Sequence, residues 1–65
     1  MCIATVYVEE EGREREVLKD VVRVEFREDG VLMVTLLGEE RLMRCKVKSI
    51  DLVRGSILIE AGDDA

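Results

Sequence analysis

The chain has 65 residues, which suffices for one domain whose core buries only about 60% of the unfolded surface. It carries 15 Asp and Glu against 10 Lys and Arg, for a net charge of −5, and it contains no histidine. The acidic balance argues against a nucleic-acid partner, and the lack of histidine excludes Ser-His and Cys-His catalysis and imidazole ligation of a metal. An enzyme is therefore the least favoured class.

The first residues show neither the basic region nor the long apolar region of a signal peptide, and no apolar run has the length of a membrane span. We therefore expect a cytoplasmic protein with reduced thiols and no membrane partner. Two cysteines are too few for a disulfide scaffold, so a metal or a partner subunit is the expected source of extra stability.

Alternation with a period of two predicts strands in the first half of the chain. Residues 3–8 are rich in β-branched types, and Ala4, Val6 and Val8 share one face. A turn over 9–13 precedes a short strand at 15–18 and a further strand at 21–27. A helix over 13–27 is disfavoured because its valines and Phe26 are poor helix formers.

The second half continues the same pattern. Asp29-Gly30 predicts a hairpin turn, and the nearly all-apolar run 31–37 predicts a central strand covered on both faces. Residues 41–47 alternate clearly, and a turn around Gly55 leads to a last strand at 57–60.

Five to six short antiparallel strands joined by tight turns predict an all-β fold. Because closure of a sheet removes exposed edges, we expect a small, partly open barrel of SH3-like or Sm-like shape. Residues 1–61 would form this single domain, followed by a polar C-terminal tail at 62–65.

Two features of the strand at 41–47 and beyond bear on function. Arg44, Lys46 and Lys48 share a face that could contact phosphate or an acidic partner, as an RNA- or protein-interaction module would. The favoured interpretation is a solvated outer face whose charges deter aggregation. Cys45 lies in phase with Met43 and Val47, which predicts core packing for its thiol.

Cys2 is the candidate metal ligand. The Met1 amine, the Cys2 amide nitrogen and the Cys2 thiolate can close two five-membered chelate rings, and planar nitrogen and sulfur donors suit Ni(II) or Cu(II). Without Met1, the Cys2 amine would replace the amide as donor. The alternative is a small apolar residue at the start of a strand, which position alone favours.

A two-fold homodimer would change the balance between these alternatives. Two copies of Met1-Cys2 meeting across the axis would offer two thiolates and up to four nitrogens to one ion. Dimerisation would thus assemble a site that one chain cannot complete.

The chain resembles the CooT family of small nickel-binding proteins. The similar segments run in order through almost the whole chain: 1–7 (Met-Cys-Ile-Ala-Thr-Val-Tyr), 19–21 (Lys-Asp-Val), 36–39 (Leu-Leu-Gly-Glu), 49–52 (Ser-Ile-Asp-Leu) and 57–60 (Ile-Leu-Ile-Glu). Cys45 departs from the family pattern, where a small or apolar residue is expected.

The resemblance implies a compact β domain that forms a homodimer and binds Ni(II) through Cys2 and the adjacent Met1 main chain. It also implies a role as nickel chaperone, store or sensor, linked to carbon monoxide dehydrogenase, with the nickel enzyme's maturation machinery as a partner. The family has carried an older label of predicted RNA-binding protein. With the resemblance, the metal-ligand interpretation of Cys2 becomes the favoured one.

Overall fold

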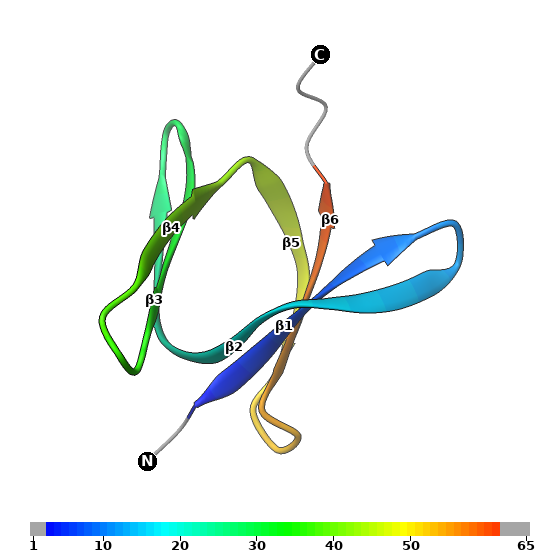
Figure 1. Cartoon of the computed structure of the whole chain (residues 1–65). Coiled ribbons are helices and arrows are strands. Elements are labelled where there is room, and N and C mark those ends of the chain that lie inside the picture. The colour runs from blue at the N-terminus through cyan, green and yellow to red at the C-terminus, as the bar shows by residue number, and fades with distance from the viewer. Residues whose placement is uncertain (1–2, 62–65) are drawn as a thin grey trace.

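The computed structural model describes residues 3–61, which form six strands around one small core (Figure 1). The strands are β1 (Ala4–Glu10), β2 (Arg13–Arg27), β3 (Gly30–Thr35), β4 (Glu40–Met43), β5 (Cys45–Asp51) and β6 (Ser56–Ala61). They make one sheet in the order β4-β3-β2-β1-β6-β5. The sheet curls into a half-barrel that is open between β4 and β5, which confirms the predicted all-β, partly open barrel.

Most neighbouring strands are antiparallel, as predicted, but β1 and β6 are parallel. Thr5 to Val8 of β1 pair in step with Ser56 to Ile59 of β6. The sheet is therefore mixed, and the expectation of a purely antiparallel sheet was wrong at this pair. Alternation within a strand sets its faces and leaves the direction of its neighbours open, so the parallel pair could not be predicted from the pattern.

The strands predicted at 15–18 and 21–27 are one long strand, β2. Its first half pairs with β1 and its second half with β3, and the register shifts at three places along its length. Each shift gives β2 an extra residue, which bends a strand and increases its twist. Asp20, between the two predicted strands, has φ of +59°. Fully extended, 15 residues would span about 50 Å, so these bulges let β2 curl within a molecule 35 Å long.

The apolar core lies on the concave face of the curled sheet. Val6 and Met33 are fully buried, and the rest of the core is Val8, Leu18, Val21, Val31, Ile57 and Ile59. Met43, Cys45 and Val47 pack against its margin, which confirms their predicted common face. The predicted strand at 41–47 is divided at Arg44 into β4 and β5.

The predicted run 31–37 is shorter and less covered than expected. β3 ends at Thr35, and only its residues Val31, Met33 and Thr35 are buried. Leu36 and Leu37 lie in the following turn and are exposed. Among residues 3–61 there is no helix with the length and apolar character needed to span a membrane. The predicted polar tail at 62–65 lies outside the described residues, and the single domain over 1–61 stays a prediction.

Candidate functional site

The start of the described chain packs against the turn between β5 and β6. The Thr5 N–H donates to the Gly55 carbonyl oxygen at 2.9 Å. Gly55 has φ of +70°, and a Cβ at this position would lie 3.0 Å from the Ile3 carbonyl oxygen. A glycine therefore suits both the backbone conformation and the close approach. The β5–β6 turn is held against the residue that follows Cys2 in the sequence.

The same turn presents two apolar side chains to solvent. The Asp51 Oδ1 accepts hydrogen bonds from the Val53 N–H at 3.0 Å and the Arg54 N–H at 2.9 Å. The Gly55 N–H donates to the Asp51 carbonyl oxygen at 2.8 Å. An aspartate that binds the following backbone in this way fixes a tight turn. Leu52 and Val53 are thereby left 80% and 97% exposed.

A second apolar turn, between β3 and β4, lies towards the same end of the sheet as the start of β1 (Figure 1). The Leu36 N–H donates to the Asp20 carbonyl oxygen at 2.8 Å, and the residue after Asp20 pairs with Ala4 of β1. The buried Thr35 hydroxyl accepts from the Glu39 N–H at 3.1 Å and so closes the turn. Leu37 at its tip is 96% exposed.

A groove of about 410 Å³, which we name the N-terminal groove, runs beside the chain start. It is lined by Ile3, Ala4, Val21–Val24 and Ile50–Ile57. Contiguous apolar surface of this kind marks an interaction site more often than a free protein surface. Our sequence interpretation did not identify this surface. The available signal was the apolar pair Leu52-Val53 inside a turn, where polar residues are the norm.

The predicted metal ligands Met1 and Cys2 lie outside the described residues, so the structure does not test them. Residues 3–61 contain no group of three or more carboxylate and thiol side chains arranged to hold a metal ion. Cys45 pairs with Ala61, whereas Asp51 at the other end of β5 pairs with Ser56 beside Thr5. A seven-residue strand spans about 20 Å from its first to its last Cα, so Cys45 is remote from Thr5 at the start of β1. Partial burial raises the pKa of its thiol.

The predicted basic face of Arg44, Lys46 and Lys48 is not a continuous stripe. Lys48 is the extra residue at a register shift between β5 and β6, and its Nζ forms an ion pair with Glu9 of β1. The hydrogen bond from Lys48 to Glu9, together with the negative charge of Glu9, raises the pKa of Lys48. Arg44 forms the corner between β4 and β5, and Lys46 is exposed on β5. Of the three predicted cations, Arg44 and Lys46 therefore remain as a shared basic surface.

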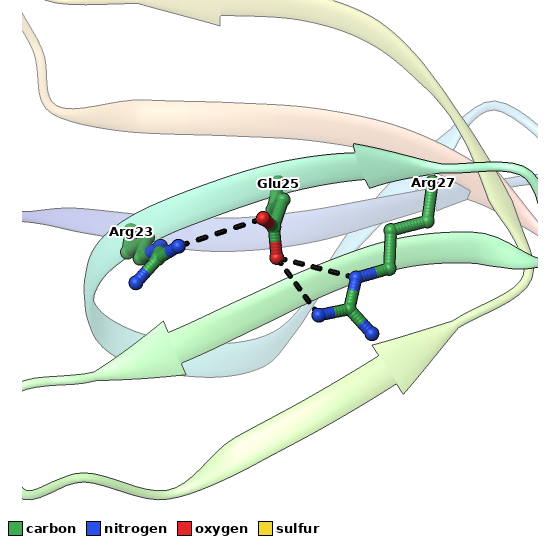
Figure 2. Close-up of polar contacts among 3 residues, drawn as sticks. All are labelled: Arg23, Glu25 and Arg27. Atoms are coloured by element: carbon green, nitrogen blue, oxygen red, sulfur yellow. Dashed lines mark hydrogen bonds and ion pairs between the residues drawn. The ribbon is translucent and has the colours of Figure 1, made fainter.

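Figure 2 shows a second charged cluster, on one side of β2. The Arg27 Nε and Nη2 donate to Glu25 Oε1 at 3.2 and 3.1 Å, and the Arg23 Nη2 lies 3.5 Å from Oε2. One carboxylate therefore holds both guanidinium groups. Exposed pairs of this kind add little stability, so the cluster contributes little to the fold. Arg23 lines the N-terminal groove.

Comparison with known proteins identifies the family. The family model described as CO dehydrogenase accessory protein CooT matches residues 1–60. The chain belongs to the CooT family. The match covers all six strands but the last residue of β6, and it includes Met1 and Cys2.

A solved structure supports the same assignment. The structure named "putative CooT from Carboxydothermus hydrogenoformans" superposes with a TM-score of 0.88 at 27% sequence identity. The alignment covers 95% of this chain and 100% of the other. No curated protein matches the chain. The resemblance predicted from short sequence segments is confirmed, and the CooT fold is the half-barrel described above.

Proposed function

We propose that this CooT-family protein is a homodimer that binds Ni(II) through Cys2 of each chain and supplies the ion during maturation of carbon monoxide dehydrogenase. The observation that carries the proposal is the family match, which begins at Met1 and extends through residue 60. It ties the Met1-Cys2 sequence to a family described as accessory to that enzyme.

The donor chemistry supports nickel as the cargo. A cysteine thiolate and main-chain nitrogens form a planar set that suits Ni(II), whereas Mg²⁺ and Ca²⁺ favour oxygen ligands. Because thiol and nitrogen donors lose protons on binding, the affinity should rise with pH. The other thiol, Cys45, packs against the core at the far end of β5 and serves as an internal control.

The surface around the chain start supports dimerisation. Ile3 and Ile50 are 40% and 49% exposed, and they line the N-terminal groove together with the more exposed Leu52 and Val53. A second copy that covered this apolar surface would bring the two chain starts together across a two-fold axis. A 65-residue domain with a small core also gains stability from such burial.

A Ni(II) titration of the reduced protein, followed by calorimetry and absorbance, tests the metal site. We expect saturation at one ion per two chains, lost in Cys2→Ser and retained in Cys45→Ser. Unchanged binding in Cys2→Ser would refute the assignment of the ligand.

Sedimentation velocity tests the dimer separately. Leu52→Asp should shift the protein towards monomer, because it places a charge on the apolar tip. Leu42→Asp is the matched control, since Leu42 is 45% exposed on β4, away from the N-terminal groove. If Leu52→Asp and Leu42→Asp dissociate to the same extent, or if both remain dimers, this surface is excluded as the interface.

A further inference from the structure

A second cavity opens at the other end of β5, between the β2–β3 hairpin and the β4–β5 corner. We name it the mouth cavity; it has a volume of about 640 Å³ and is lined by Phe26–Val31 and Arg44–Val47. Ligand pockets commonly measure about 300–1,000 Å³. Phe26, the only phenylalanine in the chain, lines this cavity and is 65% exposed, although its cross-strand partner Val31 is buried. The cavity shares no lining residue with the N-terminal groove.

One wall of the mouth cavity is the start of an edge strand. β5 is the last strand in the sheet order, so no described strand pairs with its outer edge. An unpaired edge presents backbone donors and acceptors to which an extended segment can add. The register shift at Lys48 interrupts this edge, so its regular part is Cys45–Val47, about 10 Å long.

The side chains along this edge define what an added strand must carry. Cys45 and Val47 are half-buried and pack against the core, whereas Arg44 and Lys46 are exposed. In a paired strand, the side chains opposite Cys45 and Val47 would share the face that packs against the core. The side chains that alternate with them would share the exposed face of Arg44 and Lys46. A matching segment therefore alternates apolar side chains, which face the core, with side chains that suit the two cations.

The positive charges of Arg44 and Lys46 favour acidic side chains at the positions of the added strand that lie beside them. Among residues 3–61, neither Arg44 nor Lys46 takes part in any of the ion pairs. Arg27 on the opposite rim is held by Glu25. Glu60 lies opposite Lys46 across the β5–β6 pair but forms no ion pair with it, so an acidic side chain beside Arg44 or Lys46 gains a cation that no described ion pair occupies.

We propose that the mouth cavity binds an extended peptide segment of a partner protein, with alternating acidic and apolar residues, by adding it to the edge of β5. A nucleic acid fits less well. Phe26 is the single aromatic side chain lining the cavity, which leaves little for base stacking, and a phosphate backbone has no amide groups with which to pair with a strand edge. The proposal does not depend on nickel binding or on the dimer interface.

Titration of the ¹⁵N-labelled protein with an acetylated, amidated hexapeptide of alternating aspartate and valine tests the proposal. We expect amide shifts concentrated at Phe26–Val31 and Arg44–Val47, and smaller shifts with a lysine–valine peptide of equal length. Arg44→Glu combined with Lys46→Glu should weaken binding about tenfold, because two attractive cross-strand pairs become repulsive. Phe26→Ala should also weaken it.

The matched control is Arg13→Glu combined with Arg15→Glu, which makes the same charge change on the β1–β2 hairpin and should leave the affinity unchanged. Methylation of alternate peptide amides, in the frame that faces β5, should abolish binding, and methylation in the other frame should not. The proposal is overturned if both peptides shift the same amides equally or if the shifts map elsewhere. It is also overturned if neither methylation frame matters, or if hexathymidylate binds the cavity more tightly than the acidic peptide.

Discussion

Gly30 is the position at which one added methyl group should perturb this fold most selectively. Gly30 begins β3 with φ of +149°, a conformation that residues with a Cβ rarely adopt. A Cβ there would lie 2.7 Å from the Met43 carbonyl oxygen and 3.2 Å from the Met43 carbonyl carbon. Both atoms belong to the backbone of β4, so no side-chain rotation can relieve the contact.

The expected cost of Gly30→Ala has two parts. The backbone conformation contributes about 1–3 kcal/mol, and forcing β4 away from the new methyl group about 1–3 kcal/mol more. The sum, about 2–6 kcal/mol, compares with a total stability of about 3–10 kcal/mol, from 65 residues at about 0.05–0.15 kcal/mol each. Gly30→Ala should therefore remove a large part of the free energy of unfolding.

Gly12→Ala is the matched control. Gly12 also has positive φ, +78°, but a Cβ there meets nothing within 4 Å. It should cost only the conformational part, about 1–2 kcal/mol. Urea unfolding followed by circular dichroism, at one fixed protein concentration, measures both variants. If Gly30→Ala costs no more than Gly12→Ala, the steric argument is refuted.

Two further predictions concern the turn at the N-terminal groove and the buried thiol. Asp51→Ala should lower the free energy of unfolding by about 0.5–1.5 kcal/mol and weaken the dimer, because two backbone donors lose their acceptor. Asp51→Asn keeps an acceptor oxygen, so it should lose less stability in urea unfolding and less dimer in sedimentation. Because burial raises the pKa of Cys45, the unfolded chain releases this proton first, so stability should fall as pH rises above about 9. Cys45→Ala should flatten that alkaline decline in urea midpoints, and an equally steep decline would contradict the assignment.

The local features of the fold were predictable where alternation and turn chemistry agree. The faces of β1, the hairpin at Asp29-Gly30 and the packing of Cys45 all follow from a period of two and from glycine positions. The bulges of β2 were not predictable, because Asp20 adopts a positive φ without a glycine to signal it. The parallel contact of β1 with β6 depends on packing between distant segments, which alternation does not encode.

The candidate site was predictable to different degrees. The assignment of Cys2 rests on the family resemblance, since donor chemistry alone left two interpretations open. Lys48 was expected to share a face with Arg44 and Lys46, but it is the extra residue at a register shift in β5 and forms an ion pair with Glu9. The exposure of Phe26 was not predictable either, because Phe26 alternates with Arg27 in the way that is typical of a strand with one buried face.

The parallel contact between β1 and β6 has a consequence for synthesis of the chain. The first strand and the last strand are neighbours in the middle of the sheet, and β5 is attached to the rest only through β6. During translation, β1 to β4 can pair as they emerge, but the inner edge of β1 stays uncovered until Ser56–Ala61 has left the ribosome. Ribosomes add about 5–20 residues per second, so this exposure lasts for seconds. Folding of this sheet is thus completed by β6, the last of its strands to be made, and a chain released without β6 presents an open strand edge to its neighbours.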